Sequence, residues 1–132
     1  MKRLRAPLVL VSIGLAALLA GCSGIDQPAS VAVVARFHTA LNAGDWPAID
    51  GLLSRSTRQL RAGSGTARAF RRIIERHGRY TGGELQAISR DDGRTRILWS
   101  ARYEKGPVSE LFVLVEDGGS LRIDSYTDSA QP

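Results

Sequence analysis

The chain has 132 residues, with 43% hydrophobic and 6% aromatic side chains, and 18 Lys and Arg against 13 Asp and Glu give a net charge of +5. A single Cys excludes an intramolecular disulfide framework. Residues 1–21 combine a basic start with an uncharged apolar run, which is the layout of an export signal. Without them, 111 residues with a net charge of +2 remain, enough for one domain with one modest core.

The apolar run of this signal extends from Leu8 to Ala20 and has about 13 residues. A helix that crosses a bilayer needs about 20 residues. We therefore predict a cleaved signal peptide over residues 1–21 rather than a permanent span. Its end, residues 18–22 with the sequence LLAGC, resembles the lipobox of bacterial lipoproteins, in which small residues precede a Cys that becomes the first residue of the mature chain.

The resemblance implies lipidation of Cys22: a diacylglycerol on the thiol and a further acyl chain, such as palmitate, on the freed amine. Several acyl chains anchor a protein to a membrane far more firmly than one does. An ordinary signal peptide with a chance Cys is the alternative. Residues 22–30 would be the lipidated Cys and a polar tether that holds the domain near the membrane. Because Ser23 stands where many inner-membrane lipoproteins have Asp, the resemblance favours the periplasmic face of the outer membrane.

Three helices are predicted in the first part of the mature chain. Apolar residues recur with a helical period in residues 31–43, Asp45 suits the cap of a second helix, and Thr66 suits the cap of a third that ends before Gly78. Residues 61–65 form a break rich in small residues between the last two. The apolar faces comprise Val33, Val34, Phe37 and Leu41, then Trp46, Ile49, Leu52 and Leu53, then Phe70, Ile73, Ile74 and His77.

After Gly78 the period changes from 3.6 to 2, which indicates strands. The clearest alternation places Thr95, Ile97, Trp99, Ala101 and Tyr103 on one face of a strand. The predicted strands are 85–90, 95–103, 108–116 and 121–127, separated by turns at 91–93, 105–106 and 117–119. The prediction is an α+β domain over residues 31–128, with three N-terminal helices packed on a curved antiparallel sheet of about four strands and a tail at 129–132.

The order of these elements and of their turn motifs resembles the nuclear transport factor 2-like superfamily, which includes the ketosteroid isomerases. More narrowly, it is similar to the small secreted bacterial members with no assigned function. The resemblance implies a cone in which a curved sheet wraps around helices and leaves a pocket. Its motifs are Phe37-x-x-x-Leu41-x-x-Gly44-Asp45-Trp46, Tyr103-x-x-Gly106-x-x-x-Glu110-x-Phe112 and Glu116-Asp117-Gly118-Gly119-x-Leu121-Arg122-Ile123.

Catalytic members of this superfamily use a buried carboxylate base in an apolar pocket, opposite hydrogen-bond donors. The acids that could face such a pocket are Asp50, Glu84, Glu104, Glu110 and Asp124, and none lies in a catalytic motif. We therefore predict no catalytic residue and no cofactor. An isomerase or dehydratase is the alternative, which a buried, unpaired carboxylate facing a cavity would favour; a pocket filled by Trp and Phe would favour a non-catalytic binding or assembly module.

The two histidines do not indicate a metal site, because neither His38 nor His77 has a second ligand four residues away. His38 lies beside an apolar helical stripe, and His77 lies at a helix C-terminus, where partial positive charge is favoured. The aromatic residues are expected in the core. Alternatively, they could line a pocket for a small apolar ligand, and the candidates are Phe37, Trp46, Phe70, Trp99 and Tyr103.

Positive charge is concentrated in residues 55–79, which contain eight Arg and one acid. Within the third predicted helix, the arginine stripe comprises Arg68, Arg72, Arg76 and Arg79. One interpretation is a solvated helix face. The other is a contact with anionic lipid headgroups or with an acidic protein. Nucleic acid is not an expected partner of an exported, lipid-anchored chain.

The predicted strand 108–116 is apolar on both sides. One side carries Leu111, Val113 and Val115, and the other carries Val108, Phe112 and Leu114. Helices can cover only one face of a sheet, so the second face would be an apolar surface of the kind that marks a partner. We expect the uncovered face to hold Phe112 and Leu114 and to form a homodimer, sheet to sheet.

Overall fold

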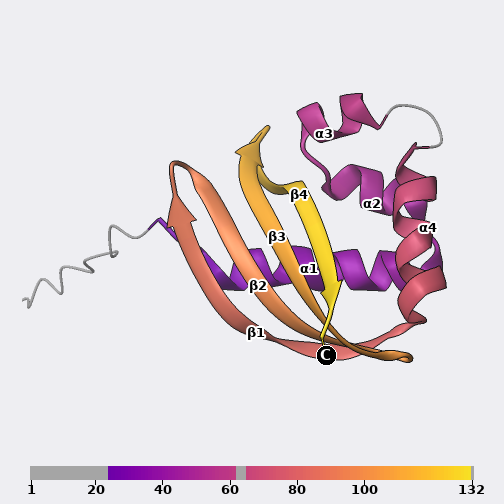
Figure 1. Ribbon diagram of the computed structural model, residues 1–132. Helices are drawn as coiled ribbons and strands as arrows, with labels where there is room; N and C mark the ends of the chain where they lie inside the picture. Colours follow the sequence, from indigo (N-terminus) through magenta and orange to yellow (C-terminus); the bar gives the residue numbers. More distant parts are fainter. Residues whose placement is uncertain (1–23, 62–64, 132) are drawn as a thin grey trace, which may run out of the picture.

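The computed structural model describes residues 24–61 and 65–131, which form helices followed by one antiparallel sheet (Figure 1). The strands follow one another in the order β1-β2-β3-β4, so the sheet is a meander. The bent sheet curves around α1, and α2 and α4 lie at one end (Figure 1). The elements are α1 Gln27–Ala43, α2 Trp46–Leu52, α3 Arg55–Leu60, α4 Gly65–His77, β1 Tyr80–Asp91, β2 Arg94–Tyr103, β3 Gly106–Asp117 and β4 Ser120–Ala130. The predicted α+β class is confirmed.

Helix α1 begins at Gln27, four residues before the predicted start at residue 31. The carboxylate of Asp26 accepts a hydrogen bond of 3.0 Å from the backbone N–H of Ala29, and a proline occupies the first turn. Both features fix a helix start without any apolar period, which is why the pattern of residues 31–43 missed them. The predicted tether is therefore shorter, because only three residues lie between Cys22 and the cap.

Helix α2 is capped as predicted, since the Asp45 carboxylate accepts from the Ala48 N–H at 3.2 Å. Ile49 and the adjoining Leu53 are buried, whereas Trp46 and Leu52 are half-buried. Helix α3 was not predicted, so the helices before the sheet number four rather than three in the described chain. Its single apolar residue, Leu60, is 88% exposed. Without a buried apolar face, α3 has no periodic signal.

Helix α4 begins at Gly65, so Thr66 lies inside the first turn. The prediction that Thr66 caps this helix was therefore wrong. The Thr66 hydroxyl instead donates to the carboxylate of Asp50 at 2.7 Å, which ties α4 to α2. Phe70, Ile73 and His77 are buried on one face, as the sequence indicated. The helix ends at His77.

Strand β2 shows the predicted alternation, with all five of its inward residues buried. Strand β1 begins at Tyr80, five residues before the predicted start, and β4 continues to Ala130 through the start of the predicted tail 129–132. The first part of β1 contains Gly82 and Gly83, which weaken a strand signal. A side chain at Gly83 would meet the carbonyl oxygen of Ser100 at 2.7 Å, so glycine allows the close approach of β1 to β2.

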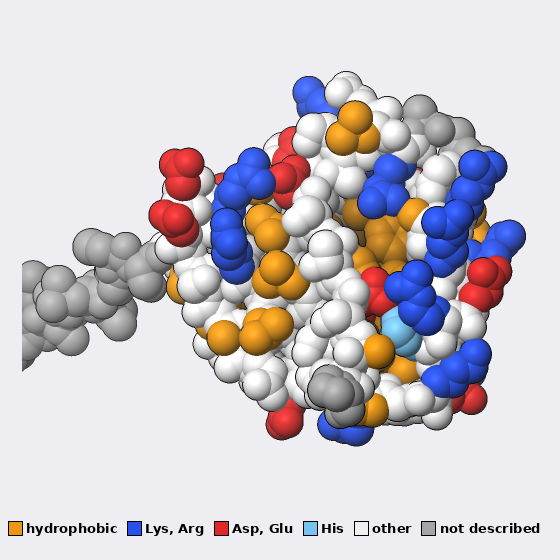
Figure 2. Space-filling view, in the orientation of Figure 1, with side chains coloured by type: hydrophobic (Ala, Val, Ile, Leu, Met, Phe, Trp, Pro, Cys, Tyr) orange, Lys and Arg blue, Asp and Glu red, His pale blue; other side chains and the backbone are white. Residues whose placement is uncertain are grey.

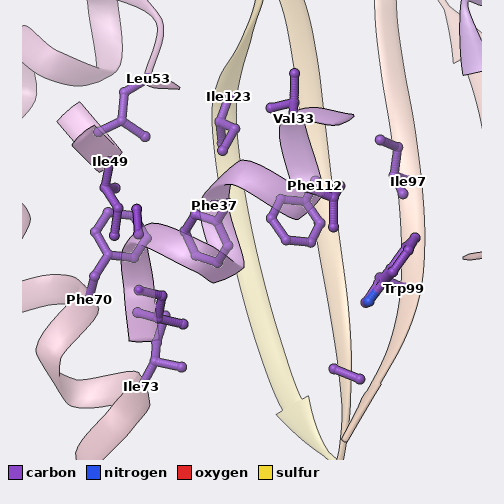
Figure 3. Close-up of a cluster of buried hydrophobic side chains, with 14 of the residues drawn as sticks. Val33, Phe37, Ile49, Leu53, Phe70, Ile73, Ile97, Trp99, Phe112 and Ile123 are labelled. Carbon is purple, nitrogen blue, oxygen red and sulfur yellow. The ribbon is translucent and has the colours of Figure 1, made fainter. Parts of the chain in front are cut away.

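The core lies between the inner face of the sheet and the helices (Figure 3). Phe37 of α1 is fully buried, and its ring packs edge to face against Phe70 of α4 and Phe112 of β3, with centroids 5.5 and 5.2 Å apart. Such aromatic pairs contribute about 0.5–1.5 kcal/mol beyond the area that they bury. The centre of the cone is therefore packed with side chains (Figure 3).

The two faces of β3 are the reverse of the prediction. Phe112 and Leu114 are both 0% exposed and belong to the core, so the helices cover the face that was expected to be open. The uncovered face carries Leu111, which is half-buried, and Val113, which is only 8% exposed. Leu111 pairs with Leu98 of β2, which is 40% exposed. Alternation along one strand fixes which residues share a face, but the sheet position relative to the helices decides which face is inside.

Candidate functional site

The interior of the cone contains one buried acid. Glu110 of β3 is 0% exposed and is the only Asp or Glu of residues 24–61 and 65–131 that is buried. One carboxylate oxygen, Oε2, lies 2.7 Å from Nε2 of His38. The other, Oε1, accepts from the hydroxyl of Tyr126 at 2.7 Å and from the hydroxyl of Tyr103. Side chains from α1, β2 and β4 thus converge on one carboxylate from β3.

His38 is held between this carboxylate and an aromatic ring. Its imidazole stacks on the Tyr80 ring with centroids 3.6 Å apart and an interplanar angle of 3°. The Tyr80 hydroxyl accepts from the indole N–H of Trp99 at 3.2 Å. The Nδ1 atom of His38 is buried and has no partner within the described chain. A proton on Nδ1 would be a buried, unsatisfied donor, so this geometry favours the tautomer with the proton on Nε2, donated to Glu110.

The tyrosines of this cluster remain protonated donors. Burial raises the pKa of Tyr103 and of Tyr126 far above the usual value near 10, and the negative charge of Glu110 raises both further. Burial also raises the pKa of Tyr80, against a smaller lowering by its hydrogen bond from Trp99. The carboxylate of Glu110 therefore accepts three hydrogen bonds, and such bonds stabilise a buried negative charge.

A second histidine and carboxylate pair lies next to this cluster. Nε2 of His77 is 2.6 Å from the Asp128 carboxylate, and the guanidinium of Arg76 is 3.6 Å from the same oxygen. The rings of His77 and Tyr103 are 5.5 Å apart. The pair joins the end of α4 to β4. No group of three or more His, Cys, Asp or Glu side chains in the described chain is arranged to hold a metal ion.

The other acids singled out in the sequence have structural partners or lie in solvent. Asp124 accepts from the Ser54 hydroxyl at 2.8 Å and from Arg94 at 3.0 Å. Glu104 accepts from the Arg79 N–H at 2.7 Å, and Glu84 is exposed. Asp50 has the bond from α4 described above. The sequence did not connect His38 to Glu110, although Glu110 stands between Val108 and Phe112 at an inward position of a strand.

The predicted ligand-pocket residues occupy the core or its edge. Phe37, Phe70, Trp99 and Tyr103 are buried, at 0%, 3%, 9% and 4% exposure. Trp46 is half-buried, and the guanidinium of Arg71 lies 5.8 Å from its ring centroid. None of the five lines any of four surface cavities of the described chain.

The largest of these cavities, about 540 Å³, lies at the mouth of the cone. It is enclosed by the start of α1, the end of α2 and the turns that join β1 to β2 and β3 to β4. Its charged lining residues are Asp26, Arg36, Arg90, Glu116 and Arg122. We call it the mouth cavity. The sequence did not indicate this cavity, because its lining comes from four separate segments without a shared motif.

The residues of the arginine stripe are all exposed, three of them on α4 and Arg79 just after it. Arg68 and Arg72 border a shallow depression of about 330 Å³ together with Arg71 and Glu75. Figure 2 shows basic side chains gathered along the edge of the molecule that α4 occupies. Arg76 contacts Asp128, and Arg79 follows the helix. The predicted stripe thus exists as a surface feature.

Comparison with known proteins identifies the fold. No protein-family model and no curated protein sequence matches the chain. An NTF-2 like protein of unknown function from Silicibacter pomeroyi is similar in structure, with a TM-score of 0.58 and 16% identity over 79% of this chain and 94% of that one. A DUF4783 family protein from Bacteroides ovatus has a TM-score of 0.54 and 10% identity over 74% and 94% of the two chains.

A SEC-C motif containing protein from Rhodopseudomonas palustris is similar as well, with a TM-score of 0.58 and 15% identity over 76% of this chain and 77% of that one. At such identities the similarity establishes the fold alone. The chain thus has the nuclear transport factor 2-like fold, in agreement with the resemblance of its motifs. Cys22 and the predicted signal peptide, residues 1–21, lie outside the described residues. Among the described residues, no helix is long and apolar enough to cross a membrane.

Proposed function

We propose that this protein is a bacterial envelope lipoprotein whose cone domain is a non-catalytic binding or assembly module. The non-catalytic role is supported by the hydrogen bonds and the burial of Glu110. Its oxygens are engaged by His38, Tyr103 and Tyr126, and its exposed surface is 0%. The domain uses its buried carboxylate to join α1 to three strands, which is a structural role.

A catalytic carboxylate needs access to substrate. A general base must lie within hydrogen-bond reach of the proton that it removes, directly or through one water. The surroundings of Glu110 are filled by aromatic rings, and the mouth cavity does not include it. An isomerase or dehydratase would require the cluster to open, and a cluster of three hydrogen bonds opposes opening.

The anchoring part of the proposal rests on the lipobox and on the short distance to the domain. The four residue steps from Cys22 to Asp26 span at most about 14 Å. The acyl chains would thus hold the start of α1 close to the bilayer. With Ser23 after the lipidated Cys, we place the protein at the periplasmic face of the outer membrane.

Fatty-acid labelling tests the anchor. In cells fed a clickable fatty acid, the wild-type chain should take up label and fractionate with membranes. Cys22→Ser should do neither, because every acyl chain depends on that thiol. Ser23→Asp is the matched control: it should keep the label and move the protein towards the inner membrane. Label on Cys22→Ser would overturn the lipoprotein proposal.

Proton exchange tests the closed interior. The imidazole N–H of His38 should give a resolved NMR signal in the full chain in a non-ionic detergent, because burial and the bond to Glu110 slow its exchange with water. The ring of His38 is 2% exposed. Exchange as fast as that of an exposed His would show an open interior and would favour the isomerase or dehydratase alternative.

We further propose a homodimer through the outer face of the sheet, now assigned to Leu98 and Leu111. Leu98 and Leu111 are paired neighbours on β2 and β3, and Leu98 is among the most exposed large apolar side chains of the described residues. Figure 2 shows apolar side chains gathered on the face of the sheet that turns away from α1. An apolar patch on a sheet is a common partner surface.

A further inference from the structure

The mouth cavity has the composition of a binding site rather than of a packing gap. Its volume of about 540 Å³ lies within the range of about 300–1,000 Å³ that is usual for small-molecule sites. One lining residue, Ser30, is 1% exposed, and its hydroxyl has no hydrogen-bond partner among the described residues. A buried hydroxyl without a partner costs free energy unless something bonds to it. The free hydroxyl of Ser30 therefore points to a polar occupant.

Positive groups surround the cavity on three sides. Arg36 comes from α1, Arg90 from the end of β1 and Arg122 from β4. Backbone carbonyls hold two of them in place: Arg90 donates to the carbonyl of Gly24, and Arg122 donates to that of Gly51. Guanidinium groups bind phosphate through paired N–H donors, and fixed ones do so at the lowest entropic cost. The cavity can thus hold a phosphate group.

The cavity also contains negative charge. Glu116 of β3 lines it, and no ion pair of Glu116 is found in the described chain. Asp26, the other acid, uses one carboxylate oxygen to cap α1. Three arginines together with two carboxylates that make no ion pair among the described residues match a ligand that carries an ammonium next to its phosphate better than a purely anionic ligand.

The position of the cavity near Cys22 indicates that such a ligand would come from the membrane. Gly24 lines the cavity and lies two residues after Cys22, a span of at most about 7 Å of extended chain. Acyl chains on Cys22 would therefore bring the mouth of the cone to the headgroup layer of the bilayer. The exposed surface of α4 is not close to Cys22 along the chain.

We propose that the mouth cavity binds the headgroup of a neighbouring phospholipid that carries a phosphate and an ammonium. This inference rests on the proposed lipidation of Cys22. The phosphate lies among Arg36, Arg90 and Arg122 and accepts from the Ser30 hydroxyl, and the ammonium lies against Glu116. The headgroup then fixes the orientation of the domain on the membrane, in addition to the acyl chains.

An NMR titration of the full chain in a non-ionic detergent tests this site. The probe is dihexanoyl phosphatidylethanolamine, and dihexanoyl phosphatidylglycerol and inorganic phosphate are the comparison ligands. The ethanolamine lipid should shift the amide signals of Ser30, Thr95 and Leu121 with saturation, and the other two should bind more weakly. Glu116→Gln should remove the preference for the ethanolamine headgroup over the glycerol one.

Two arginine variants provide the matched comparison. Arg36→Gln should weaken binding about fivefold, the factor expected for one Arg near a lipid phosphate, because its side chain makes only a weak bond within its own helix. Arg96→Gln, an equally exposed residue of β2 outside the cavity, should leave binding unchanged.

Three results would overturn the site: no saturable shift, equal binding of inorganic phosphate, or an Arg36 variant that binds as well as wild type. The titration needs no acyl chain on Cys22, so its failure is distinct from a failure of the labelling experiment.

Discussion

Removal of the Glu110 side chain should cost more stability than any single substitution on the surface of this domain. Glu110→Ala leaves the Nε2–H of His38 and the hydroxyls of Tyr103 and Tyr126 buried without an acceptor. An unsatisfied buried donor costs about 1–3 kcal/mol, so three of them cost at least about 3 kcal/mol. Small domains have about 5–15 kcal/mol in total. The variant is therefore expected to be largely destabilised.

Glu110→Gln should cost less, about 1–3 kcal/mol, because only one of the three contacts is lost. The amide oxygen can still accept from both tyrosines, whereas the amide N–H₂ faces Nε2 of His38. Nε2 could accept from it only if the proton moved to Nδ1, which has no partner. Urea unfolding of the detergent-solubilised full chain, followed by the fluorescence of buried Trp99, measures both variants.

The control is Glu116→Ala, an exposed acid of the same strand, which should change the free energy of unfolding by less than about 0.5 kcal/mol. If Glu110→Ala lost less than about 1 kcal/mol, the three donors would have found other partners. The structural role that we assign to Glu110 would then be wrong.

Three further outcomes are expected. The pKa values of Tyr103 and Tyr126 are raised in the folded state, so the contribution of these two neutral hydroxyls to the free energy of unfolding is intact below pH 10 and is lost as the pH rises above 10. With two such groups, the free energy of unfolding should fall by about 3 kcal/mol per pH unit, and tyrosinate absorbance should appear only when the domain unfolds. Sedimentation of the Cys22→Ser chain should show a dimer that the additional change Leu98→Ser makes monomeric; a Cys22→Ser chain that is already monomeric at high micromolar concentration would refute the sheet interface. Replacing the first three arginines of the stripe with Gln should weaken binding of polyglutamate several-fold at low salt and less at high salt, and an unchanged isotherm would return the stripe to a solvated face.

The elements that sequence reasoning identified are those with a periodic apolar face. Strand β2 is the clearest case, because every second residue from Thr95 to Tyr103 is buried. Helix α3 and the first residues of β1 have no such face, and they form because neighbours hold them. In α3, Ser54 caps the helix and its hydroxyl also contacts Asp124 of β4. Contacts of that kind join residues 70 positions apart, and a local pattern does not contain them.

The polar cluster was missed for a related reason. Each member had a plausible local explanation: His38 beside an apolar stripe, and Glu110 as one acid among five that could face a pocket. Only the three-dimensional arrangement shows that α1 places His38 opposite the inward side of β3. An acid at an inward strand position, flanked by Val108 and Phe112, was the available signal, since such an acid must find buried partners.

The structure contains two basic surfaces, the arginine stripe and the mouth cavity, and the sequence indicated only the first of them. Helix α1 has 17 residues and is therefore about 25 Å long. The mouth cavity lies at its start, beside Gly24, whereas the side chain of Asn42 near its end accepts from the N–H of Tyr80, just after α4. The proposed tether from Cys22 is shorter than α1, so a domain anchored there and standing on its mouth would point the arginine stripe away from the membrane (Figure 1). Of the two partners considered for the stripe, this arrangement favours an acidic protein over the anionic lipids of the anchoring membrane.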